Sequence, residues 1–281
     1  MDNINQYIAK FERKLALNLR AAWARAYVRI VGVNREPSWV IFDTLLPVVG
    51  LAAYVFYYKA LGAPSAFFGM VILGGAMTAY WMNVLWAMAS QFYWEKQGGN
   101  LQLFLMSPMS RMAILLGMAL GGGFSTTIRA LASLFLGMVI FRIPFAIASV
   151  WQLLGIFFLT LIALYGLGML FASAYMLWGR EAWHVSNLLT EPIYLLSGFY
   201  FPVRALGFWV ALAASAIPTT LGLDGLRQVL LSGKAYAFLS VPVEMGILAV
   251  LCVAFLILAH YMLRYMENLG KREGRLTLRW Q

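Results

Sequence analysis

Three ionisable residues lie inside otherwise apolar stretches of this 281-residue chain: Asp43, Arg129 and Glu191. If those stretches span a membrane, such residues are costly there, and they usually face a cavity or a partner of opposite charge. Acid–base catalysis would require several such groups at one place. Because the three are scattered along the sequence, they predict charge pairing or substrate contact rather than a catalytic centre.

Each of these residues has more than one interpretation. Arg129 could extend to external headgroups, pair with an acid such as Glu244 or Asp224, or bind an anionic substrate. It lies about 17 residues into its apolar stretch, which at 1.5 Å per residue places it in the outer half of a span. Asp43 is close enough to the start of its stretch to be solvated. Glu191 directly precedes a proline, so it could line a translocation path or hydrogen-bond to backbone groups that the proline leaves unpaired.

The sequence offers little for a metal or a nucleotide. One cysteine, Cys252, and two distant histidines, His184 and His260, make a metal site improbable and exclude an intramolecular disulfide. No G-x-x-x-x-G-K-[ST] loop occurs, and the one Gly-Lys pair, at 233–234, is followed by alanine. We therefore expect no metal or other cofactor in this chain and no ATP hydrolysis by that route.

The elements that position these residues follow from composition. The chain is 62% hydrophobic and 11% charged, with a mean hydropathy of +0.77, whereas soluble domains carry about 25% charged residues. A soluble fold is excluded, and an all-α membrane protein is predicted. Six stretches are apolar enough to span a bilayer: Trp39–Tyr58, roughly Ala66–Phe92, Met112–Ile140, Trp151–Trp178, the shorter Ser186–Phe201, and Pro242–Leu263. Residues 202–241 are too apolar for an ordinary loop and predict re-entrant external helices between spans five and six.

Basic residues orient these spans. Fifteen Lys and Arg residues fall on the side of the two termini and five on the other. By the positive-inside rule both termini are cytoplasmic. This gives a predicted organisation of residues 1–38 before the spans, 39–264 as the transmembrane domain, and 265–281 as a basic cytoplasmic tail.

Residues 1–38 predict an amphipathic helix rather than a secretory signal, because they contain seven basic residues and no uninterrupted apolar core. Apolar residues recur at steps of three or four from Ile4 to Ile30. Such a helix can lie in the membrane interface, or it can be solvated and docked on a partner.

The loop between spans two and three is stiff and partly apolar. Gly98 and Gly99 end the preceding helix after Glu95 and Lys96. Leu101, Phe104 and Leu105 line one side of a short helix, which Ser107 and Pro108 stop before Arg111 anchors the next span. The loop predicts a cytoplasmic projection that inserts into a groove of a partner; alternatively, it is solvated and its charges only mark the cytoplasmic side.

This loop resembles the coupling-helix region of ABC-2 type transporter permeases, in which an acidic residue, Gly-Gly or Gly-Thr and leucines precede Ser-Pro-x-Ser-Arg. A second stretch resembles the fifth span and external helices of the same family. Its matching residues are Glu191-Pro192, Leu196-Ser197-Gly198, Phe201-Pro202, Ile217-Pro218, Gly225-Leu226-Arg227 and Gly233. The order of these motifs along nearly the whole chain supports the resemblance more than any single motif does.

The resemblance implies the transmembrane permease subunit of an ATP-driven exporter in a prokaryotic plasma (inner) membrane. The partners it implies are ATP-binding cassette ATPase subunits, which would bind ATP and Mg²⁺, and a second permease that is a copy or a paralogue; no nucleic-acid partner is expected. Residues expected to couple to the ATPase are Glu95, Lys96, Gly98, Gly99, Leu101, Phe104, Leu105, Ser107, Pro108 and Arg111. Residues expected along the substrate path are Arg129, Glu191, Tyr194, Phe199 and Tyr200.

The sequence leaves the cargo open among hydrophobic small molecules, lipid-linked glycans and polysaccharides, and slightly favours small or lipidic cargo because no large external domain is present. Two other classes are weaker alternatives. A membrane enzyme that modifies lipids would need polar residues gathered at one depth. A passive channel or secondary transporter would be supported by inverted repeats, which the sequence does not display.

Overall fold

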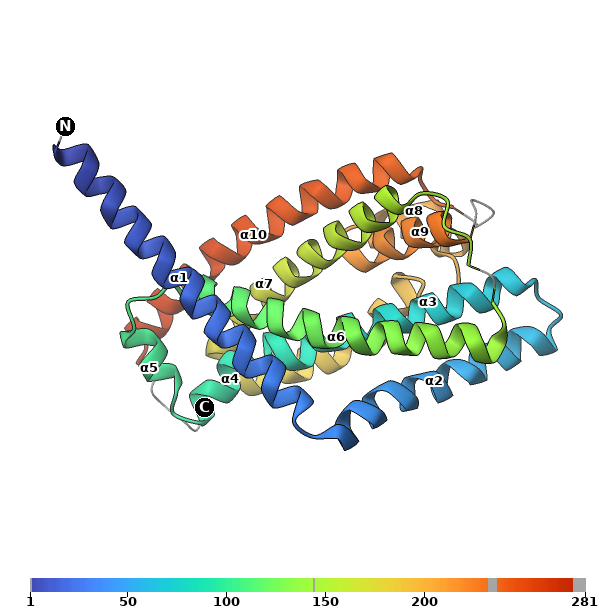
Figure 1. The fold of residues 1–281 in the computed structure, drawn as a ribbon, viewed down its shortest axis with the longest axis horizontal. Coiled ribbons are helices and arrows are strands. Elements are labelled where there is room, and N and C mark those ends of the chain that lie inside the picture. Colours follow the sequence, from blue (N-terminus) through green and yellow to red (C-terminus); the bar gives the residue numbers. More distant parts are fainter. Residues whose placement is uncertain (1, 144, 232–236, 275–281) are drawn as a thin grey trace.

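The computed structural model describes residues 2–143, 145–231 and 237–274. Over these residues it contains helices and no β-strand, which confirms the all-α membrane class. The longer helices lie side by side, with α4 and α5 at one end and α8 and α9 at the other (Figure 1). The elements are α1 (Asp2–Asn34), α2 (Pro37–Ala60), α3 (Ser65–Met82), a π-helix (Asn83–Ala89), α4 (Gln91–Gln97), α5 (Leu101–Met106), α6 (Arg111–Phe141), α7 (Val150–Leu196), a 3₁₀ turn (Val203–Leu206), α8 (Phe208–Ala214), α9 (Pro218–Leu230) and α10 (Val241–Arg272).

Five described helices are long and apolar enough to cross a membrane: Val40–Ala60, Ser65–Gln97, Arg111–Phe141, Val150–Trp178 and Val241–Arg272. The pair α8 and α9, bent by 111°, is either a sixth, broken span or a re-entrant loop. The expected fifth span is not among these five, so the count of six spans stays a prediction. Residues 232–236 of the predicted re-entrant segment and 275–281 of the predicted tail lie outside the described residues.

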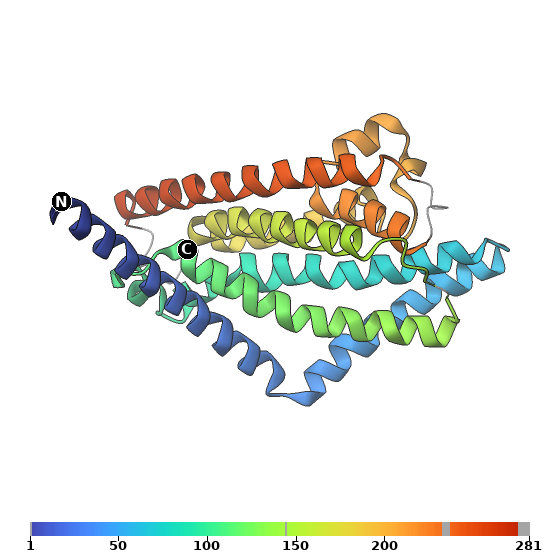
Figure 2. The same cartoon turned by 45° about the horizontal axis from the view of Figure 1, so that its top comes forward.

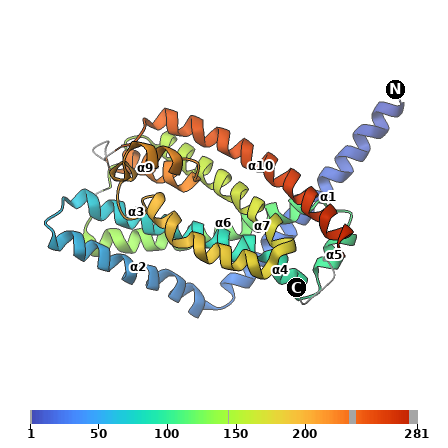
Figure 3. The same ribbon diagram turned by 180° about the vertical axis from the view of Figure 1, so that it is seen from behind.

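Helix α7 contains the predicted fourth span and the start of the fifth, and it folds back on itself. Tyr175 Oη and Ser186 Oγ are hydrogen-bonded, although residues 11 apart in a straight helix are separated by about 16 Å. Both halves of α7 also contact α9. Thr160 in the first half packs against Gly222, and the hydroxyl of Ser197, directly after the second half, is hydrogen-bonded to that of Thr219 at 3.0 Å. The returning part is the yellow to gold segment in Figure 3.

Helix α1 packs along the first turns of α6 and forms a V with α2 (Figure 2). A Cβ on Gly117 would lie 2.3 Å from the Ala22 carbonyl oxygen, and one on Gly121 would lie 2.7 Å from that of Ala26. These two glycines of α6 therefore permit the close backbone approach. Five other apolar residues of the predicted amphipathic face are exposed in this chain: Ile8, Phe11, Leu15, Leu19 and Trp23.

At the opposite end, α9 is buried and is held by Arg227. The guanidinium donates to the carbonyl oxygens of Phe201 at 3.0 Å, Phe199 at 2.9 Å and Met70 at 3.2 Å. The Phe199 carbonyl also lies against Gly74 of α3, where an added Cβ would be 1.6 Å away. One buried side chain thus joins α9, the segment after α7 and α3.

A second polar group joins α9 to α10. Gln228 donates to Asp224 at 3.1 Å, to Glu244 at 3.3 Å and to the Leu239 carbonyl at 2.8 Å, while Asp224 accepts the Phe238 backbone N–H at 2.8 Å. Asp224 and Glu244 are both buried. They belong to this cluster and are not the partners of Arg129, so that predicted pairing is wrong.

Candidate functional site

The loop from α4 to α6 has the turns that its sequence predicts. Gly99 adopts a φ of +78°, which glycine tolerates without strain, between α4 and α5. Ser107 is extended, and α5 ends there, just before Pro108. The backbone N–H of Ser110, which precedes α6, donates to Asn18 Oδ1 of α1 at 2.8 Å. The loop is therefore fixed to both α1 and α6.

Glu95 anchors this loop inside the chain. Its side chain is 9% exposed and forms an ion pair with Arg25 of α1. It also accepts from Gln91 at 2.7 Å and from Asn100 at 3.0 Å. Lys96 is buried as well. Through these three donors the Glu95 carboxylate ties α1, α4 and the turn before α5 together.

The apolar residues of α5 divide into a buried and an exposed set. Leu101 is 2% exposed and packs in the core, and Phe104 is half-buried with the Arg25 guanidinium 5.5 Å from its ring centre. Leu105 is also half-buried. Leu103 and Met106 are 61% and 76% exposed and were not among the residues that the sequence singled out.

Arg111 joins the end of the loop to α10. Its guanidinium donates to Glu267 at 2.7 Å and to the Leu105 carbonyl at 3.4 Å. Lys271, one turn after Glu267 on α10, donates to the same carboxylate at 2.6 Å. The start of α6 and the end of α10 are thus held by one carboxylate, which can transmit a displacement between them.

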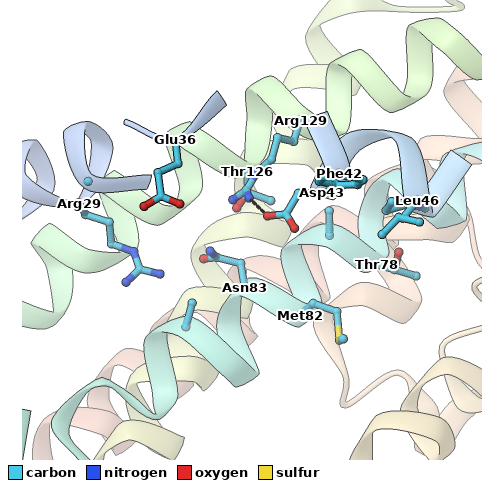
Figure 4. Close-up of a pocket in the computed structure, with 14 residues that line it drawn as sticks. Arg29, Glu36, Phe42, Asp43, Leu46, Thr78, Met82, Asn83, Thr126 and Arg129 are labelled. Carbon is cyan, nitrogen blue, oxygen red and sulfur yellow. Dashed lines mark hydrogen bonds and ion pairs between the residues drawn. The ribbon is translucent and has the colours of Figure 1, made fainter. Parts of the chain in front are cut away.

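A pocket of about 670 Å³ opens between α1, α2, α3, the π-helix and α6 (Figure 4). Charged and polar side chains line one part of it, and α2 and α3 supply apolar ones. The lining residues are Arg29, Gly32, Glu36, Phe42, Asp43, Leu46, Pro47, Thr78, Ala79, Met82, Asn83, Ala87, Thr126 and Arg129.

In this pocket Arg129 forms an ion pair with Asp43. Arg129 is the nineteenth residue of α6, whereas Asp43 is only the seventh of α2. The two therefore lie at one level, and the expectation that Arg129 is in the outer half while Asp43 is near the cytoplasmic start is wrong. The cause is that the first turns of α6 pack against α1. Helix α2, which follows α1, therefore reaches α6 only further along, near Arg129.

Arg29 enters the same pocket from α1. Its guanidinium donates to Gln91 at 3.4 Å, and Gln91 in turn donates to Glu95. Burial lowers the pKa of Arg29 from its ordinary value because it desolvates the cation. Asn83, at the start of the π-helix, accepts from Tyr165 at 3.0 Å and lies against Gly122, which leaves room for it. Such π-helical segments frequently occur at functional sites.

The chain that forms this site matches a known family of transporters. Residues 18–231 match the ABC-2 type transporter family. The chain belongs to this family. No curated protein matched the chain. The matched range contains the second half of α1, the α4–α6 loop, the pocket and α9. This multi-pass membrane protein is therefore the permease component of an ABC transporter, a family that works with ATP-binding cassette ATPase subunits.

The other predicted path residues of the permease gather near its α9 end. Tyr194 makes an edge contact with Phe199, with ring centres 5.1 Å apart, and Tyr200 stacks on Tyr54 at 4.1 Å. Phe199 is fully buried, and Glu191 is exposed one turn before Tyr194. Arg129 lines the α1–α2 pocket instead, and none of the other four predicted path residues does. Their role in a substrate path stays a prediction.

Sequence reasoning missed several residues at these two places. Arg25 and Arg29 entered only the count of basic residues, although their spacing of four places them on one side of α1. Leu103 and Met106 had no distinguishing signal, because α5 is apolar at five of its six positions. Nothing in the sequence marked Asn83.

Breaking the anchor of the loop should destabilise the permease measurably. Glu95→Gln should lower its unfolding free energy by about 1–2 kcal/mol, since a charge-assisted hydrogen bond contributes more than a neutral one. Arg25→Met should lower the unfolding free energy by a similar amount. The double variant should lose no more unfolding free energy than the less stable of the two single variants. Melting of the purified variants measures this coupling. Glu12→Gln, an exposed carboxylate on α1, serves as the control; strictly additive losses for the pair would contradict the anchor.

Proposed function

We propose that this permease is the transmembrane subunit of an ATP-driven ABC-2 type exporter. Separate ATPase subunits bind ATP and Mg²⁺, and two of them assemble with two permeases, the second being a copy or a paralogue. The complex resides in a prokaryotic plasma (inner) membrane with both permease termini in the cytoplasm. Its cargo is hydrophobic, lipidic or glycan in nature.

The α4–α6 loop carries this proposal. It presents two exposed apolar side chains, Leu103 and Met106, on a short helix. Behind them the loop is fixed by Glu95 and Arg111 to α1, α6 and α10. An apolar tip on a fixed base suits insertion into a groove of a partner, because the base prevents the tip from yielding when the partner moves.

The mechanism follows from these attachments. When ATP closes the partner subunits, the groove displaces α5, and the Glu95 and Arg111 ion pairs carry this displacement to α1, α6 and α10. The change in packing opens a path to the outside, beside α8 and α9. The higher affinity of ATP for the closed state supplies the energy, as it must for any ligand-driven shift.

Purification of the tagged permease from membranes of its own host, in a mild detergent, tests the assignment. Mass spectrometry of the retained proteins should find an ATP-binding cassette subunit in stoichiometric amount, and a retained paralogue would identify a heterodimeric permease. A permease that purifies alone, in a detergent that keeps comparable transporters intact, would contradict the proposal.

A further inference from the structure

The pocket between α1, α2, α3 and α6 is polar at one end and apolar at the other. We propose that it binds one phosphate-bearing lipid amphiphile, with the phosphate at Arg29 and an acyl chain along α2. This goes beyond the proposed function, since it assigns a ligand to a site away from the ATPase-coupling loop; only the direction in which the lipid points rests on the proposed topology.

Arg29 supplies the phosphate-binding group. Among the described residues, Gln91 is its one hydrogen-bond partner, at 3.4 Å, although a guanidinium has five N–H donors. Arginine binds phosphate through two parallel hydrogen bonds, and such bonds are about twice as strong as neutral ones. The half-buried position of Arg29 strengthens this attraction further, because water screens it less than at an exposed site.

The other charges of the pocket leave Arg29 as the cation available to an anion. Arg129 is neutralised by Asp43. Glu36 lies on the exposed rim, where solvent and salt screen its charge. The Asn83 amide oxygen accepts from Tyr165, so its N–H groups are the donors that this side chain still offers in the same pocket as Arg29 (Figure 4).

The apolar end indicates a lipid rather than a free anion. Phe42 and Leu46 of α2 are 58% and 64% exposed, and Met82 of α3 is 40% exposed. All three line the pocket on helices that qualify as membrane spans. An inorganic phosphate would leave this wall uncovered, whereas an acyl chain lies against it and is contiguous with the bilayer.

The order of the lining residues matches the direction of a lipid in the inner leaflet. Arg29 and Glu36 lie where α1 meets α2, at the predicted cytoplasmic side. Leu46 and Pro47 follow further along α2 and are therefore deeper in the bilayer. The phosphate thus lies on the predicted cytoplasmic side of the acyl chain, and the chain points further into the membrane.

Native mass spectrometry of the full-length permease, without ATPase subunits, tests this site. The probes are dioctanoyl phosphatidic acid, the matching diacylglycerol, which lacks the phosphate, and inorganic phosphate. The wild-type protein should bind the phosphatidic acid about tenfold more tightly than either other probe. Arg29→Gln should lose about tenfold in affinity for it, and Arg29→Lys should retain part. Leu46→Gln should weaken phosphatidic acid binding at the apolar end.

Arg13→Gln is the matched control, because Arg13 is an exposed arginine of α1 that does not line the pocket. Equal losses in Arg13→Gln and Arg29→Gln would show diffuse surface electrostatics and overturn the site. So would unchanged binding in a monodisperse Arg29→Gln protein. Inorganic phosphate bound as tightly as phosphatidic acid would overturn the assignment of a lipid. Because the assay needs no ATPase, its outcome is separable from that of the co-purification.

Discussion

Replacing Leu103 and Met106 together by aspartate should reduce ATP-driven transport at least tenfold while the permease still folds and inserts. Both side chains are exposed, at 61% and 76%, so the free permease gains no buried charge from the change. In the proposed complex they fill an apolar groove of the ATPase. Burying a Leu or Met side chain contributes about 1.5–3 kcal/mol, and a carboxylate would have to be desolvated at the same place. Transport into proteoliposomes that contain the complex measures the effect.

The choice of position separates this result from misfolding. Leu101, two residues earlier, is 2% exposed, so an aspartate there would disturb folding and could not report on the interface. Leu61→Asp is the matched control, because Leu61 is 63% exposed but follows α2 at the other end of the molecule. It should transport normally. Normal coupled transport by a correctly inserted Leu103→Asp, Met106→Asp variant would show that α5 is not the coupling element.

Replacing Arg227 by leucine should destabilise the end of the permease that contains α8 and α9 by roughly 3–5 kcal/mol, the range seen when one partner of a buried charged contact is removed. The change leaves the carbonyl oxygens of Phe199, Phe201 and Met70 buried without their donor. It also leaves the buried Asp224 one turn away without a nearby cation. Few domains have enough stability to absorb such a loss. The yield of monodisperse protein and protease cleavage between α7 and α10 measure it.

Arg204→Leu provides the comparison for Arg227→Leu. Arg204 lies in the 3₁₀ turn of the same region but is exposed, so its removal should change stability by less than about 0.5 kcal/mol. Arg227→Lys keeps the charge and should recover only part of the loss, because an ammonium group lacks the planar fork of donors. Wild-type stability of Arg227→Leu would mean that water replaces the guanidinium and that Arg227 does not hold this region together.

The sequence alone predicted most of the helices because the bilayer imposes a length and a composition on each. The predicted spans Met112–Ile140 and Trp151–Trp178 differ by one residue at most from the apolar helices of the structure. The turns of the α4–α6 loop were equally readable, because Gly99 and Pro108 act through their own backbone preferences. These are local effects, and a single chain segment contains all the information they need.

The charge pairs and the exposed face of α5 were decided only by the tertiary structure. Asp43 and Arg129 are 86 positions apart in the sequence. They meet because α1 packs against Gly117 and Gly121 in the first turns of α6, so that α2, which follows α1, reaches α6 only near Arg129. Periodicity could not identify the outward side of α5, since a helix this short and this apolar has no polar face to mark it. Such features depend on the relative placement of helices, which packing against distant residues determines and hydropathy does not encode.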